Sequence, residues 1–161
     1  MTGASHGDIA GSDRAGFSLL ELVMVVAIIG VLAAIAAPRY GRAIARYRAD
    51  MAARRIAADL ALAGRAARTA GASKTVSFSV AGAEYTIPGL PSLRDSTLDY
   101  RVVLSDSPYQ APVVSADFGG DADVAFDGYG TPDSGGTVSI QVGEYSKTIV
   151  LDAGSGKATI Q

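Results

Sequence analysis

Residues 16–37 read GFSLLELVMVVAIIGVLAAIAA, and this stretch predicts more about the chain than any other. From Phe17 onward it holds 21 residues, and at about 1.5 Å per residue such a helix reaches roughly 30 Å, the thickness of a bilayer's hydrocarbon core. Its one charged residue is Glu21. Because an ionisable group at the centre of a membrane costs roughly 2.5–3.5 kcal/mol, a carboxylate inside a span indicates a functional role. The stretch therefore predicts a membrane anchor that also serves in recognition and assembly.

Charge is distributed unevenly along the chain, although the 161 residues sum to a net charge of only −2. Residues 39–70 carry a net charge of +6 from eight arginines and two aspartates, whereas residues 71–161 carry −6. The sequence thus predicts a basic stalk and an acidic head. It contains no cysteine, so neither a disulfide nor thiol chemistry is available.

Two ordinary kinds of targeting segment compete to explain the apolar run. A cleaved secretory signal has an apolar region of about 7–15 residues and a small-residue cleavage site, whereas here Pro38 and Arg39 follow a longer run. A plain signal anchor would follow the positive-inside rule, which places the arginines after Ala37, and the head behind them, in the cytoplasm. An exported head therefore requires a topology signal other than loop charge.

The residues around Glu21 carry a resemblance to a known class of proteins. Gly16, Phe17 and Glu21, followed by an apolar helix and Pro38, resemble the class III signal of type IV pilins and type II secretion pseudopilins. The resemblance implies that a prepilin peptidase cuts between Gly16 and Phe17 and so removes residues 1–16 as a leader. It also implies that Phe17, the new first residue, is N-methylated and that Glu21 serves in assembly.

The same resemblance implies a location and a set of partners. Residues 17–38 would cross the inner membrane once and carry a periplasmic head into a periplasmic filament. The implied partners are membrane lipid, the prepilin peptidase, other pilins or pseudopilins and the inner-membrane assembly platform, with secreted cargo also open. Cleavage before Phe17 creates an α-amino group with an ordinary pKa of about 7.7–8.0. Glu21 lies one helical turn away, so the two charges can neutralise each other within or between subunits and set the axial register.

Residues 39–71 predict an amphipathic helical stalk. Pro38 removes one helical hydrogen bond, so we expect a kink there, and Gly71 is a suitable helix end. Apolar residues recur at helical spacing and predict a stripe that packs on the head: Tyr40, Ile44, Tyr47, Met51, Ala52, Ile56 and Leu60. We expect the arginines to be solvated or to pair with acidic heads of neighbouring subunits. Binding of nucleic acid or anionic lipid is the alternative.

From residue 72 to residue 161 the pattern changes to short alternating segments separated by turns, which predicts strands. The expected strands are 74–80, 84–87, 98–104, 112–115, 124–126, 136–142, 145–151 and 157–160. Residues 142–145 and 152–156 are typical of hairpin turns. The expected fold is therefore α+β: a long N-terminal helix, membrane-spanning and then stalk, packed on a small antiparallel β head.

The C-terminal turns narrow the resemblance. VAFDGYGTP at 124–132, GGTV at 135–138 and GSGKA at 154–158 are similar to the GspH/FimT group of minor pseudopilins and minor pilins. We therefore expect a minor pseudopilin of a type II secretion pseudopilus. Two alternatives stay open: a FimT-like minor type IV pilin in pilus assembly or DNA uptake, and a membrane-anchored binding module that never polymerises. DNA is the less expected partner, because DNA binding needs exposed positive charge and the head is acidic.

No catalytic, cofactor or strong metal site is expected. The one histidine, His6, lies in the predicted leader, which leaves neither a nucleophile–histidine pair nor a His/Cys metal site. GSGK at 154–157 lacks the remainder of a phosphate-binding loop. Weak calcium candidates are the carboxylates of Asp121, Asp123 and Asp127, whose spacing does not fit the EF-hand pattern.

Overall fold

The computed structural model describes residues 16–92 and 95–161, so nearly all of the predicted leader lies outside the described residues. The described chain contains one helix followed by eight strands. It divides into two compact units, Met1–Pro38 and Arg39–Gln161. The second unit holds the stalk part of the helix together with the whole of the β head.

The helix α1, Leu19–Ala70, includes both the apolar span and the stalk. Its end is fixed by a turn at Gly71, where the N–H of Ala72 donates to the C=O of Ala67 at 3.2 Å. Gly71 has a φ of +59°, a left-handed conformation that favours glycine, and the predicted helix end is thereby confirmed. The helix continues through Pro38, and the kink expected there stays a prediction.

Four strands form the first antiparallel sheet, in the order β3-β2-β1-β5. These strands are β1 (Lys74–Ser79), β2 (Glu84–Pro91), β3 (Asp99–Val103) and β5 (Asp123–Phe126). β2 runs further than the expected 84–87, because the chain resumes its pairing with β3 after a register shift. Within that irregularity the N–H of Gly89 donates to the Oδ1 atom of Asp99 at 2.8 Å, which replaces a lost ladder hydrogen bond.

The remaining strands form a second antiparallel sheet, in the order β4-β6-β7-β8. They are β4 (Val113–Asp117), β6 (Gly136–Val142), β7 (Tyr145–Leu151) and β8 (Ala158–Ile160). β6 and β7 pair from Gly136 opposite Leu151 to Val142 opposite Tyr145, which leaves a two-residue turn as predicted. Strand positions were therefore predicted well, whereas the division into two sheets was not predicted.

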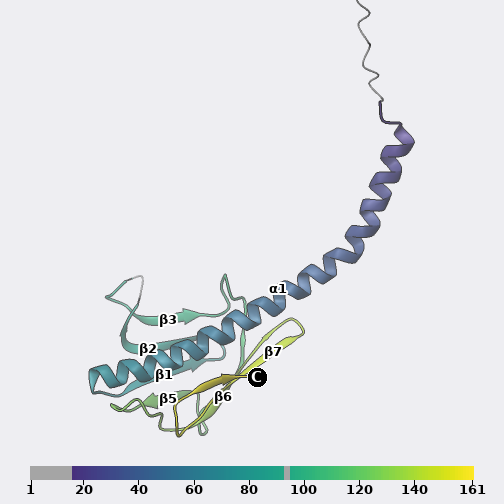
Figure 1. The fold of residues 1–161 in the computed structure, drawn as a ribbon. Coiled ribbons are helices and arrows are strands. Elements are labelled where there is room, and N and C mark those ends of the chain that lie inside the picture. The colour runs from purple at the N-terminus through teal and green to yellow at the C-terminus, as the bar shows by residue number, and fades with distance from the viewer. Residues whose placement is uncertain (1–15, 93–94) are drawn as a thin grey trace, which may run out of the picture. The chain divides into compact units, whose positions relative to one another are not determined.

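The stalk part of α1 lies against both sheets and shares one core with them (Figure 1). Alternate residues of the strands point into this core, as in β5, where Val124 and Phe126 are buried between exposed or half-buried neighbours. The helix contributes a stripe of mostly small buried residues: Ala49, Ala52, Ala53, Ile56, Leu60, Ala63 and Ala67. The α+β prediction of a long helix on a small antiparallel head is confirmed.

The first part of the predicted apolar stripe is wrong. Tyr40 and Tyr47 are 71 % and 64 % exposed, while Ile56 and Leu60 are buried as predicted. Small residues decide the inward face, because alanine side chains at spacings of three and four let the helix approach the sheets closely. The two tyrosines therefore stand on the solvent side of the stalk and are available for other contacts.

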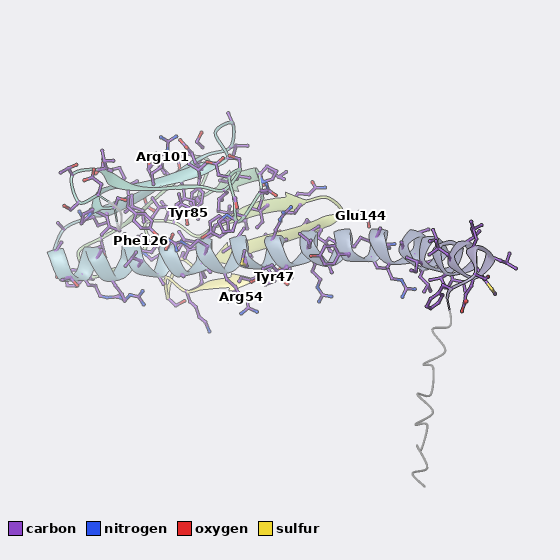
Figure 2. The ribbon with its side chains drawn as sticks, turned by 90° about the horizontal axis from the view of Figure 1, so that it is seen from above. Tyr47, Arg54, Tyr85, Arg101, Phe126 and Glu144 are labelled. Atoms are coloured by element: carbon purple, nitrogen blue, oxygen red, sulfur yellow. The ribbon has the colours of Figure 1, made fainter. Side chains whose placement is uncertain are left out.

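The turn after β5 packs tightly on α1, and Figure 2 labels Phe126 at this place. A Cβ atom added to Gly64 would lie 3.3 Å from both the Gly130 carbonyl oxygen and the Phe126 Cδ1 atom. Gly130 has a φ of +75°, and its own added Cβ would come within 2.5 Å of the Gly64 carbonyl oxygen. Two facing glycines thus bring helix and turn into contact, which gives the 124–132 segment a structural role.

Candidate functional site

The large apolar side chains of the span are exposed in the single chain. Phe17 is 82 % exposed and Ile35 is 56 % exposed. In the part of the chain that the structure describes, α1 is the one helix long and apolar enough to cross a membrane, and 0 % of its most apolar window is buried. A signal sequence near the N-terminus can satisfy the same criteria of length and composition. An exposed surface of this kind needs lipid or other apolar helices as its surroundings.

The residues at the predicted cleavage site precede the helix. Gly16, Phe17 and Ser18 are exposed and non-helical, and α1 begins at the next residue. The Ser18 Oγ atom accepts a hydrogen bond from the backbone N–H of Glu21 at 3.2 Å and so caps the helix. Sequence reasoning missed this cap, although a serine three residues before a glutamate is its usual signal. The peptide bond between Gly16 and Phe17 thus lies outside the helix, between two exposed residues.

Glu21 lies in the first turn of α1, where a negative charge interacts favourably with the helix dipole. Its carboxylate is exposed and forms no hydrogen bond or ion pair with any described residue. A carboxylate in an apolar span is costly without a partner. An ammonium group at Phe17, once free, is a chemically suitable partner from the same chain or from a neighbour.

A buried polar cluster joins α1 to the first sheet, and sequence reasoning missed it. Asp59 is 5 % exposed. Its Oδ2 atom accepts hydrogen bonds from Tyr85 Oη at 2.5 Å, Tyr100 Oη at 2.8 Å and Arg55 Nε at 2.9 Å. Arg55 also donates to the hydroxyl oxygen of Tyr100. The sequence feature that could have revealed the cluster is an aspartate between Ile56 and Leu60, on the buried face of the helix.

The cluster shifts the pKa values of the groups around Asp59. Burial, and then the neighbouring carboxylate, raise the pKa of Tyr85 well above its usual range. Burial and the hydrogen bond to Asp59 raise the pKa of Tyr100 to about 12. Burial lowers the pKa of Arg55, but the nearby Asp59, Tyr100 and Tyr109 together outweigh it and the net shift is upward. Within the described residues no buried side-chain nitrogen or oxygen lacks a partner, so the cluster is a satisfied structural link.

The acidic loop residues named as calcium candidates bind their own backbone. Asp121 Oδ1 accepts from the N–H of Asp123 at 3.0 Å, and Asp127 Oδ1 accepts from the N–H groups of Tyr129 and Thr131 at 2.9 and 2.8 Å. Such bonds shape turns. Across residues 16–92 and 95–161 no three His, Cys, Asp or Glu side chains gather where a metal ion could be held.

Comparison with known proteins finds a likeness at the N-terminus. Residues 11–37 match the prokaryotic N-terminal methylation motif. Two Dichelobacter nodosus proteins, both described as type IV major fimbrial protein FimA, are 68 % identical to the chain over 31 residues. That alignment covers 19 % of this chain and 20 % of each relative, so the chain spans about a fifth of the relatives it matches. No solved structure matches the chain.

A second likeness covers the stalk and the head together. The family described as type II transport protein GspH matches residues 52–155, which run from the buried stripe of α1 to the turn after β7. This match is more than half of the 161 residues. With the methylation motif at its N-terminus, the protein belongs to the GspH family and is a type IV pilin-like or pseudopilin subunit.

Proposed function

We propose that the protein is a minor pseudopilin, a structural subunit of a type II secretion pseudopilus. The observation that carries this proposal is a GspH-type head that follows an exposed apolar helix with an unpaired Glu21 in its first turn. A prepilin peptidase cuts after Gly16, and Phe17 is then methylated. Residues 17–38 hold the subunit in the inner membrane, with the head in the periplasm, until the assembly platform adds it to the filament.

In this proposal the protein serves as a structural subunit that binds other subunits, and it catalyses no reaction. The apolar surface of residues 17–37 is covered by lipid before assembly and by the helices of other pseudopilins afterwards. In the filament, Glu21 meets the amino group of Phe17 in the same or a neighbouring subunit. Breaking such a pair once it is buried costs roughly 3–5 kcal/mol. This cost gives the helix bundle a preferred axial register, while the head displays a surface to partners.

A DNA-uptake pilin of the FimT kind is the less favoured alternative. The head carries a net charge of −6, which repels nucleic acid. The likeness to type IV fimbrial proteins covers only 31 residues toward the N-terminus, where both kinds of filament share a processing motif, so it favours neither kind of filament. The acidic head therefore supports protein partners, and secreted cargo is among them.

Intact mass and N-terminal sequencing of the protein from its own membranes test the processing. We expect a chain that begins at Phe17 and carries one additional methyl group. A chain that retains residues 1–16 in cells with an active prepilin peptidase would contradict the proposal. It would leave a signal-anchored protein whose arginines after Ala37 favour a cytoplasmic head.

Assembly is tested by replacing Glu21. We expect Glu21→Ala to abolish cross-linking of the subunit to other pseudopilins in cells, while membrane insertion continues because the span becomes more apolar. Glu144→Ala is the matched control, since Glu144 is an exposed glutamate in the turn between β6 and β7. Unchanged cross-linking of the Glu21 variant would instead support a membrane-anchored module that does not polymerise.

A further inference from the structure

A hollow of about 740 Å³ lies on the stalk beside the turn between β6 and β7. Its polar lining consists of Arg39, Arg42, Arg46, Tyr47, Asp50 and Tyr145. All of these residues belong to the compact unit Arg39–Gln161, so the hollow is a feature of the stalk and head alone. Figure 2 labels Tyr47 on α1 and Glu144 in the turn next to Tyr145.

The hollow has an excess of positive charge. Arg39, Arg42 and Arg46 lie at spacings of three and four, which places them on one face of α1. None of their guanidinium groups forms a hydrogen bond or ion pair with a described residue. The one carboxylate in the lining, that of Asp50, already pairs with Lys147 Nζ at 3.6 Å. The positive charges of the three arginines are therefore not neutralised by side chains of the hollow.

The head contributes Tyr145, the first residue of β7, to the lining of the hollow. A Cβ added to Gly143 would lie 3.9 Å from the Cβ of Ala45, so the β6–β7 turn rests on the helix at ordinary contact distance. The turn then places Tyr145 opposite the arginine face. On the helix itself, Tyr47 is 64 % exposed. The result is a concave surface of guanidinium groups flanked by phenol rings.

The position of the hollow in the chain indicates which kind of anion suits these arginines. Arg39 is the second residue after Ala37, where the apolar run ends. Residues 39–46 rise about 10 Å along a helix, and the head-group layer on each side of a bilayer is roughly 5–8 Å thick. Tyrosine and arginine are typical of this layer, where the rings lie at the interface and the cations meet lipid phosphates.

We propose that this hollow binds the phosphate of a phospholipid head group in the leaflet on the side of the head, with a preference for anionic lipid. The inference rests on the proposed membrane anchoring of residues 17–38. Guanidinium groups suit it because each can donate two parallel hydrogen bonds to phosphate oxygens. The bound phosphate neutralises arginines that would otherwise stay unpaired on the exported side of the membrane. It also fixes the depth and rotation of the stalk before assembly.

Native mass spectrometry of the full chain in uncharged detergent micelles tests this inference. The probes are dioleoylphosphatidylglycerol, dioleoylphosphatidylcholine and inorganic phosphate. We expect the wild-type chain to retain phosphatidylglycerol in preference to phosphatidylcholine, and inorganic phosphate to compete poorly. Arg42→Gln with Arg46→Gln should weaken retention of phosphatidylglycerol by about tenfold or more. Arg54→Gln with Arg65→Gln removes the same charge from exposed sites outside the hollow and should leave retention unchanged.

Three results would overturn the inference. If both double variants lose phosphatidylglycerol retention equally, the effect depends on net charge and not on the hollow. Displacement of the lipid by an equal concentration of inorganic phosphate would make the hollow a site for free anions. If the Arg42/Arg46 variant loses dimers but retains lipid as the wild type does, the arginines bind the acidic head of a second copy. The single variants Arg42→Gln and Arg46→Gln, each expected to show part of the loss, replace the double variant if it does not fold.

Failure of this inference is separable from failure of the proposed function. Cleavage after Gly16 and dependence of assembly on Glu21 involve neither arginine. A correctly processed, Glu21-dependent subunit with no lipid preference would overturn the lipid site alone. An uncleaved chain that still binds phosphatidylglycerol through Arg42 and Arg46 would overturn the pseudopilin proposal alone.

Discussion

Asp59 is a charged residue in the core formed by α1 and the two sheets, and three donors meet on one of its oxygens. Asp59→Ala would leave those donors without an acceptor. We expect the free energy of unfolding to fall by about 3 kcal/mol, near the lower end for a buried pair, because the Arg55 side chain remains 34 % exposed. Denaturant unfolding in uncharged detergent, followed by tyrosine fluorescence, measures this change.

The matched control is Asp50→Ala, which removes an aspartate from the same helix. Asp50 pairs with Lys147 at 3.6 Å, and both side chains are about a third exposed. Because exposed ion pairs contribute roughly 0–1 kcal/mol, this variant should remain near wild-type stability. Equal effects from the two aspartates would show that the Asp59 cluster does not hold the helix to the head.

The tyrosines of the same cluster predict a loss of stability at high pH. The pKa of Tyr100 is raised to about 12, and that of Tyr85 is raised as well, against an ordinary value of about 10. Above pH 10 the unfolded chain therefore releases phenol protons that the folded chain retains, so stability falls as pH rises from about 10 to about 12. Unfolding curves and phenolate absorbance should show this, and Tyr100→Phe should lessen the slope. Constant stability up to pH 12 would contradict it.

At the scale of elements, the contact between α1 and the turn after β5 depends on two facing glycines. Gly64→Leu would drive a side chain into the Gly130 carbonyl and the Phe126 ring. We expect a loss of about 1–3 kcal/mol in the free energy of unfolding, as for overpacked cores. Gly41→Leu is the control, because a Cβ at Gly41 meets nothing within 4 Å and leucine is the better helix former. An unchanged Gly64→Leu variant would mean that the turn moves freely away from the helix.

The elements themselves were largely predictable, and their arrangement was not. Alternating side chains and hairpin turns are local signals, so the strands and the helix end at Gly71 followed from sequence. The division into two sheets depends on pairings between distant strands. The exposure of Tyr47 likewise depends on which helix face the sheets select. Asp59 was missed because its partners, Tyr85 and Tyr100, come from strands far along the chain.

The candidate sites divide in the same way. Gly16, Phe17 and Glu21 form a linear motif within six residues, so the sequence predicts them, and their roles stay predictions until the mature chain is sequenced. The arginine hollow has no such motif. The spacing of its arginines can be read from the sequence. Tyr145 joins them only because the β6–β7 turn packs on the helix, which the sequence does not predict.

At the scale of the whole molecule, the charge order along the chain opposes the proposed topology. Residues 39–70 carry +6 directly after the span, and loop charge alone would keep this segment in the cytoplasm. We nevertheless expect alkaline phosphatase fused after Gln161 to be active, because the enzyme works only when exported and the proposed pseudopilin has its head in the periplasm. A β-galactosidase fusion at the same residue is the control and should be inactive. The reverse pair of results would place the head in the cytoplasm.

Replacing Arg39, Arg42 and Arg46 by glutamine sharpens this test of topology. If loop charge set the orientation, the wild-type fusion would be inactive and the triple variant would gain phosphatase activity. If another signal sets it, both fusions should be active. The wild-type arginines then require an anion on the exported side, which lipid phosphate supplies in the membrane. Neighbouring acidic heads can supply it in the filament, since residues 71–161 carry −6. The opposite charges of stalk and head thus suit a subunit that exchanges lipid for protein when it assembles.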